Sequence, residues 1–213
     1  MRYLVRDPLA PLGLHRYRHG RDTWSADSPN ARERENIWVK LDAMQGTRCA
    51  YCEASIASLD RHIEHFQQRN RHPQGTFDWH NLFGSCNRRT SCGKHKDNCG
   101  HYTPNDLIKP DNENPENLLV FTPNGAVMPR ANLDAVQQRR AEETIRILNL
   151  NGALSQIRRA EVFGYLQIAE EIAQLAQDFS EDEWLPILQE ELQRTANLPF
   201  STAIKHVLTP QHE

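Results

Sequence analysis

Long apolar runs are absent from this sequence. Hydrophobic residues make up only 38% of the 213 residues, the mean hydropathy is −0.73, and no segment approaches the roughly 20 apolar residues of a membrane span. The first residues contain neither the apolar segment nor the cleavage site of a secretory signal peptide. We therefore expect a cytoplasmic protein without membrane contact. The chain is long enough to bury a core, but its polarity predicts a thin one.

Cysteine is also scarce, and its few copies are confined to one segment. All five cysteines lie between Cys49 and Cys99. An odd number in a reducing compartment argues against a disulfide framework, and this clustering favours metal binding. Buried, reduced cysteines without a metal are the alternative.

Charge is distributed unevenly along the chain. Residues 61–101 carry seven Lys or Arg against three acids, and they hold six of the ten histidines. Residues 102–213 carry nine basic and seventeen acidic residues. A basic middle in an otherwise acidic chain predicts local contact with a polyanion. Chance clustering of solvated charges would give the same counts.

The pattern divides the chain into three parts and predicts an α+β, mostly helical fold. Residues 1–46 combine an irregular arm with a helix. Residues 47–128 are rich in turns, resemble a metal-binding segment, and end in a β-hairpin around a Pro-Asn-Gly turn. Residues 129–213 predict a helical lobe with apolar stripes.

Helix boundaries are marked by capping residues. Ser28 or Asn30 can begin the first helix, and Gly46 ends it. In the last third, Ser180 opens a helix that Pro186 is expected to kink or shorten. The apolar stripes of the last third include Val136, Ile145, Phe163, Leu166, Ile172 and Leu175.

Four of the cysteines have spacings typical of a zinc site. Cys49 and Cys52 are separated by two residues, so that a tight turn can direct both thiolates at one tetrahedral ion. Cys86 and Cys92 can complete a four-thiolate site, although their spacing is wider. Cys99 competes for either of those places. We expect one structural Zn²⁺ at Cys49, Cys52, Cys86 and Cys92.

An acid–histidine pair follows the first two cysteines, in the stretch "HIEHF" from His62 to Phe66. Glu64 suits a hard cation such as Mg²⁺ or Mn²⁺, and a neutral His65 can take a proton from water near pH 7. Polar residues that merely surround a zinc site are the alternative. His62 is expected to support the site or to lie in solvent rather than to bind metal.

These residues, with the stretch that follows, resemble the HNH endonuclease family, whose core is a ββα-metal hairpin and helix. The resemblance gives Glu64 the metal-binding role, His65 that of general base, and Asn81 the bracing of the loop between the strands. Gly93 follows Cys92 where the family has Asn, while Lys96 keeps the family's Lys position.

The second ligand of the catalytic metal must therefore come from another residue. His95, Asp97 and Asn87 are the candidates, and His95 is preferred. The basic residues Arg88, Arg89, Lys94 and Lys96 are expected to contact nucleic-acid phosphates.

The resemblance extends to the PtuB branch of the family through "LDAMQGTRCAYCE", "CGKHKD" and "ETIRILNLNG". It implies an effector nuclease of a Septu or retron-linked anti-phage system. Its implied partners are nucleic acid (DNA or RNA), the ABC-type ATPase PtuA and, in a retron, a reverse transcriptase with its non-coding RNA and DNA. The helical region 129–213 would then dock the ATPase. A catalytically inactive, zinc-stabilised adaptor of the same complex is the alternative.

Overall fold

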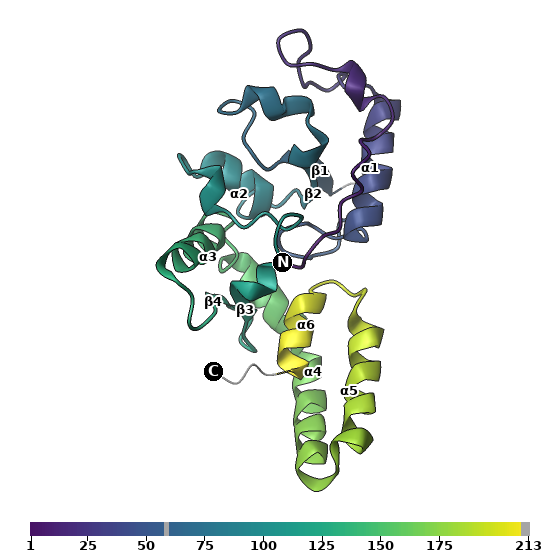
Figure 1. The fold of residues 1–213 in the computed structure, drawn as a ribbon, viewed down its shortest axis with the longest axis vertical. Coiled ribbons are helices and arrows are strands. Elements are labelled where there is room, and N and C mark those ends of the chain that lie inside the picture. Colours follow the sequence, from purple (N-terminus) through teal and green to yellow (C-terminus); the bar gives the residue numbers. More distant parts are fainter. Residues whose placement is uncertain (58–59, 210–213) are drawn as a thin grey trace.

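A computed structural model describes residues 1–57 and 60–209 (Figure 1). The predicted α+β class, with much helix and small sheets, is confirmed. The helices and strands are α1 (Ala31–Gln45), β1 (Arg61–His65), β2 (Leu82–Cys86), α2 (Cys92–Asn98), β3 (Leu119–Phe121), β4 (Val127–Pro129), α3 (Ala135–Ile147), α4 (Ala153–Asp178), α5 (Glu181–Thr195) and α6 (Ser201–Leu208). In the described ranges no helix is both long enough and apolar enough to cross a membrane.

Helix α1 forms where its capping residues predicted it. The Asn30 side chain accepts a hydrogen bond from the Glu33 backbone N–H, and Gly46 ends the helix in a left-handed conformation with a φ of 61°. At its last residue, the Gln45 side chain exchanges hydrogen bonds of 2.8 and 2.9 Å with the backbone of Gly84. This contact fixes the end of α1 against the middle of β2.

Strands β1 and β2 form an antiparallel pair in which Glu64 lies opposite Phe83 and Arg61 lies opposite Cys86. The chain between them makes a loop with two short 3₁₀ turns, Pro73–Phe77 and Trp79–Asn81. Helix α2 follows β2 after five residues and packs against it. The order β1, β2, α2 is therefore a ββα unit, with Glu64 and His65 at the end of its first strand.

The C-terminal third is helical, and its β3–β4 hairpin is antiparallel as expected (Figure 1). Two details of this region bear on the prediction. Val136 and Phe163, which belong to the apolar stripes, are 68% and 69% exposed because they lie on the outer faces of α3 and α4. The predicted shortening at Pro186 is wrong, since α5 continues through it to Thr195, and Pro186 lies early in the helix, where the missing N–H removes one bond of the ladder.

Contacts cross the predicted boundary between residues 128 and 129. The Arg48 guanidinium donates hydrogen bonds of 3.0 and 2.9 Å to the carbonyls of Ala196 and Leu198, and the Glu53 carboxylate accepts one from the Thr202 N–H. The turn that carries the first two cysteines is thereby held by the start of α6. The three-part division stays a prediction, and residues 210–213 of its last part lie outside the described ranges.

Candidate functional site

The structure brings the four predicted zinc ligands together. The sulfur atoms of Cys49, Cys52, Cys86 and Cys92 all lie within 4.8 Å of one another, and all four residues are buried. Cys49 and Cys52 lie in the turn after α1, Cys86 ends β2, and Cys92 begins α2 with a φ of 54°. Cys99 lies at the other end of α2, outside this group and only partly buried.

The protonation of these cysteines fits a cation site. Burial opposes ionisation of Cys49, but hydrogen bonds with the three neighbouring thiols hold its pKa well below the ordinary value. Hydrogen bonding to Cys49 in turn raises the pKa values of Cys52 and Cys92. One thiolate thus accepts from its neighbours in a buried group of four soft donors, the donor set that Zn²⁺ prefers in structural sites. The four residues present fit a zinc ion.

Glu64 is almost completely buried, with 2% of its surface exposed. Its Oε2 atom accepts a hydrogen bond of 3.0 Å from His62 Nε2, and its Oε1 atom lies 2.7 Å from the Lys96 ammonium. Burial alone would raise the pKa of this carboxyl group, but His62 and Lys96 together lower it below the ordinary value. Glu64 is therefore an ionised carboxylate near pH 7. The expectation that His62 supports the site agrees with this contact.

His65 follows Glu64 at the end of β1 and is 6% exposed. Its Nε2 atom lies 2.9 Å from the carbonyl oxygen of Thr76. Because a carbonyl only accepts, Nε2 carries the proton, and the lone pair of the neutral ring lies on Nδ1. Burial lowers the pKa of His65 to about 4, so the ring is neutral near pH 7. The Trp24 ring packs edge to face against it, with the ring centroids 4.5 Å apart.

Asn81 lies at the end of the loop between β1 and β2 and ties that loop together. Its side-chain oxygen accepts a hydrogen bond of 2.7 Å from the Gln67 N–H, while its Nδ2 atom donates to the carbonyls of Gln67 and Gly75. These three bonds hold the segment that supplies the Thr76 carbonyl to His65. Asn81 therefore positions the imidazole through the backbone.

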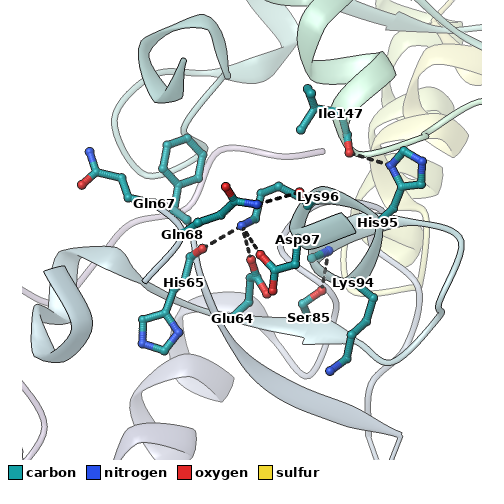
Figure 2. Close-up of polar contacts among 12 residues, drawn as sticks. Glu64, His65, Gln67, Gln68, Ser85, Lys94, His95, Lys96, Asp97 and Ile147 are labelled. Atoms are coloured by element: carbon teal, nitrogen blue, oxygen red, sulfur yellow. Dashed lines mark hydrogen bonds and ion pairs between the residues drawn. The ribbon is translucent and has the colours of Figure 1, made fainter. Parts of the chain in front are cut away.

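Lys96 is buried, whereas a contact with a nucleic-acid phosphate requires an exposed side chain. It is 0% exposed, and its ammonium group donates to the His65 carbonyl at 3.0 Å and pairs with Glu64 and Asp97. A buried ammonium with three oxygen partners is not available to nucleic acid, so its assignment to phosphate binding is corrected. Figure 2 shows Lys96 reaching from α2 to the carboxylates of Glu64 and Asp97.

His95 points in a different direction from these carboxylates. Its Nδ1 atom bonds to the carbonyl of Ile147 at 2.8 Å, at the end of α3, and Figure 2 shows the ring turned away from Glu64. The structure therefore does not bring His95 and Glu64 together, whereas Asp97 lies beside Glu64. Asn87 follows Cys86, at the strand end away from Glu64. The geometry supports Asp97, not His95, as the second ligand of a catalytic metal.

At Gly93, where the HNH enzymes that this chain resembles carry Asn, the structure leaves no space for a side chain. A Cβ atom built on Gly93 would lie 2.3 Å from Glu64 Oε2, far inside contact distance. The backbone of α2 thus passes directly against the carboxylate. Any side chain at this position would displace Glu64 or the helix, and the carboxylate of Asp97 lies one turn further along α2.

A hollow of about 370 Å³ opens over Glu64 and His65. Four cationic side chains line it: Arg34, Arg61, Arg69 and Lys94. Arg88 and Arg89, also predicted to contact phosphate, are exposed in the loop between β2 and α2. Trp24 and Arg34 were missed by sequence reasoning. Nothing in the local pattern of the N-terminal arm or of the first helix indicates that these two side chains face β1.

The chain matches no family model. It is similar to a protein of Vibrio cholerae serotype O1 biovar El Tor named "Retron Vc95 putative HNH endonuclease", with 29% identity over 128 residues. The match covers 56% of this chain and 60% of the relative, so the chain spans less than two thirds of that relative's length. This similarity and the ββα unit both agree with the resemblance of the chain to HNH endonucleases.

Proposed function

We propose that this protein is a metal-dependent HNH endonuclease that hydrolyses phosphodiester bonds in nucleic acid. The observation that carries the proposal is the pair at the end of β1: an ionised Glu64 beside a neutral His65 whose Nδ1 lone pair is available. A buried carboxylate and a neighbouring base under a cationic hollow form the combination that phosphodiester hydrolysis needs. The resemblance to HNH enzymes and the similarity to the Vibrio protein support the same reaction.

His65 is the general base of the proposed reaction. Its Nδ1 atom takes a proton from a water molecule, and the oxygen of that water attacks phosphorus in line with the leaving 3′ oxygen. The Thr76 carbonyl holds the proton on Nε2 and so keeps the ring in the tautomer that accepts at Nδ1. The buried position beside Trp24 restricts rotation of the ring.

Glu64 and Asp97 are the residues that would hold a catalytic Mg²⁺ or Mn²⁺. Their carboxylates converge, since both lie within 3 Å of the Lys96 ammonium, and oxygen donors suit these hard cations. When bound, such an ion neutralises the charge that develops on the phosphate and on the leaving oxygen. Lys96 would fix the two carboxylates by pairing with both. Cys49, Cys52, Cys86 and Cys92 would hold a separate Zn²⁺ that stabilises the fold.

The cationic side chains of the hollow would hold the substrate backbone. Arg69 and Lys94 would supply these contacts, since arginine and lysine both pair with phosphate oxygens. Arg61 already pairs with Asp42, and the Arg34 guanidinium donates to three backbone carbonyls. The acidic C-terminal lobe would repel nucleic acid and leave these contacts to the middle of the chain.

The test is a cleavage assay with the purified full chain, labelled DNA and labelled RNA, in the presence of Mg²⁺ or Mn²⁺. The proposal expects strand scission that requires the added metal and disappears in Glu64→Gln, which keeps the shape of the side chain but not its charge. If the wild-type chain cuts neither substrate, with or without its ATPase partner, the alternative of a catalytically inactive adaptor is favoured.

The two candidate metal ligands are distinguished by their variants. Asp97→Asn should lower the cleavage rate by about tenfold or more, because it removes one of two anionic ligands, and raising Mn²⁺ should restore part of it. His95→Ala should have a smaller effect on cleavage, since the ring bonds to Ile147. The reverse ranking at saturating Mg²⁺ would return the ligand role to His95.

We further propose that the nuclease is the effector of an anti-phage defence complex with a PtuA-type ATPase. The name of the Vibrio relative, which refers to a retron, and the resemblance to PtuB proteins support this proposal. A reverse transcriptase with its non-coding RNA and DNA would be a further partner in a retron. The α4–α5 hairpin extends away from the ββα unit (Figure 1) and carries exposed apolar residues, including Phe163 and Ile187.

Docking of the ATPase through the α4–α5 hairpin is tested by point variants, because truncation would remove α6 from its contacts with Arg48 and Glu53. Phe163→Glu and Ile187→Glu should each weaken co-purification of the ATPase by roughly tenfold, the loss typical of an interface anchor. Both residues are exposed, so zinc content and metal-dependent cleavage should not change. Val136→Glu, on the exposed face of α3, is the matched control. Full retention of the ATPase by both variants would place the docking surface elsewhere.

A further inference from the structure

A second and larger hollow adjoins the hollow of the proposed active site. It measures about 620 Å³, and Trp24, Arg69 and Asp97 line both hollows, so the two form one continuous depression. Residues 19–24 of the N-terminal arm and residues 68–70, in the loop after β1, line the larger hollow. A nucleic-acid strand that continues from the scissile phosphate into the larger hollow would therefore pass the arm.

Positive charge is concentrated where the arm approaches this hollow. Residues 15–21, the basic loop, read "HRYRHGR", with three arginines, two histidines and no acidic residue. All of them except Tyr17 are exposed, and the side chains of Arg16 and Arg21 are 70% and 64% exposed. Exposed cations so close together repel one another, and a polyanion that binds there removes this cost. The basic loop is therefore suited to a ligand with several negative charges.

Two anchors hold the basic loop in place before any ligand binds. At the first, the Tyr17 ring stacks on Phe77 with the ring centroids 5.4 Å apart, and the Tyr17 hydroxyl donates a hydrogen bond to Glu33. At the second, just beyond the loop, the Trp24 carbonyl accepts a hydrogen bond of 3.1 Å from the Arg69 guanidinium. The exposed arginines are therefore presented by a positioned backbone, which lowers the entropy cost of binding.

Contacts of the basic loop bring its arginines to the hollow. Arg21 lines the hollow, and its guanidinium donates a hydrogen bond to the Arg16 carbonyl. The Arg18 N–H donates a hydrogen bond of 2.8 Å to the carboxylate of Asp22, which also lines the hollow. Charges this close to the lining act on a phosphate inside it, because screening at physiological salt extends over roughly 8 Å. The Arg18 side chain itself has no hydrogen-bond or ion-pair partner among the described residues.

The two acidic residues that line the larger hollow are both paired with cations. Asp22 Oδ2 lies 3.0 Å from Arg21 Nε, and Asp97 Oδ1 lies 2.9 Å from the Lys96 ammonium. In the proposed reaction Asp97 would also hold the catalytic metal. Neither carboxylate therefore presents an uncompensated charge to a phosphate, and Arg18 remains to attract one.

We propose that the basic loop is a phosphate-binding element, which holds the nucleic-acid backbone beside the cut through Arg18 and Arg21. This inference rests on the proposed function for the class of ligand. Arginine suits phosphate oxygens, and contacts to the backbone carry no sequence information, so the basic loop adds affinity for any sequence. Figure 1 shows this loop, in dark purple, at the end of the molecule opposite to the α4–α5 hairpin, where nine acidic and three basic residues (153–195) would repel the same backbone.

The test is the salt dependence of binding, measured by fluorescence anisotropy of labelled DNA and RNA, each as duplex and as single strand, without added divalent metal. Each phosphate contact contributes about 0.9 with a duplex, and about 0.7 with a single strand, to the slope of log affinity against log salt concentration. Arg18→Gln should lower the slope by that amount and weaken binding roughly fivefold at about 0.15 M salt. The loss should be the same for probes of unrelated sequence.

Further variants separate the effect of charge from an effect on folding. Arg18→Lys keeps the charge and should keep the wild-type slope, whereas loss of a structural guanidinium contact would affect both Arg18 variants alike. Arg21→Gln should weaken binding more than Arg18→Gln, because it also leaves Asp22 without its cationic partner. Arg159→Gln, which removes an exposed arginine of α4, is the control that should change neither the slope nor the affinity.

An unchanged slope in both Arg18→Gln and Arg21→Gln would overturn the proposal. With Mg²⁺ or Mn²⁺ added, Arg18→Gln should raise the substrate concentration at half-maximal cleavage rate roughly fivefold, because the basic loop binds the backbone beside the reacting atoms and not at them. If the slope falls as expected but no probe is cut, the phosphate-binding role stands and the proposed nuclease reaction fails. If the probes are cut and neither variant changes the slope or the half-saturating concentration, the nuclease reaction stands and the phosphate-binding role fails.

Discussion

Replacing His65 with Asn is expected to lower the rate of metal-dependent cleavage by about 100- to 10,000-fold, the contribution typical of a positioned general base. Asn fills part of the space of the imidazole with a neutral amide, but it has no basic lone pair at the position of Nδ1. The measurement is the single-turnover cleavage rate at saturating metal. Binding of the oligonucleotide should change little, because the lost interaction concerns the attacking water and not the bound phosphate.

Asn is preferred to Ala because of where the imidazole lies. The ring is buried between the Thr76 carbonyl and Trp24, so His65→Ala would leave a larger cavity than His65→Asn. His80→Ala is the matched control, because His80 is exposed in the same loop region. Wild-type rates in His65→Asn would show that another group removes the proton.

The ββα unit was predictable because its signals are local. Cysteines two residues apart, an acid–histidine pair and an Asn before a short apolar stretch each lie within a few residues, and the antiparallel pairing of β1 with β2 joins them. The caps of α1 and α5 were predictable for the same reason. In each of them the residues that bond to one another are three positions apart in the chain.

The roles of α2 residues were not predictable from spacing. Lys96, His95 and Asp97 are consecutive, yet the helix directs Lys96 into the core, His95 toward α3 and Asp97 toward Glu64, because successive residues of a helix point about 100° apart. The phase of so short a helix depends on how Cys92 begins it, with a positive φ and an N–H bonded to Leu148. The place of Trp24 likewise depends on contacts more than 40 residues distant in sequence.

Loss of the proposed zinc ion is expected to have the largest effect on stability. Cys86→Ala should remove the ion and unfold the region between α1 and α2 near physiological temperature. Structural zinc contributes about 10–16 kcal/mol to folding in small zinc-binding peptides, more than the roughly 5–15 kcal/mol by which a whole domain is usually stable. Elemental analysis should find one zinc per wild-type chain, and chelation should lower the thermal unfolding temperature of the wild type.

Cys99→Ala provides the control for this prediction. Cys99 belongs to the same segment and was a competing ligand by spacing, but it lies at the far end of α2, outside the group of four sulfur atoms. The variant should keep one zinc per chain and unfold at the wild-type temperature. Loss of zinc from Cys99→Ala with retention in Cys86→Ala would contradict the site. Because Cys86 ends β2 and Cys92 begins α2, removal of the ion should also reduce cleavage, since the ion would fix the helix that carries Asp97 against the strand that pairs with Glu64.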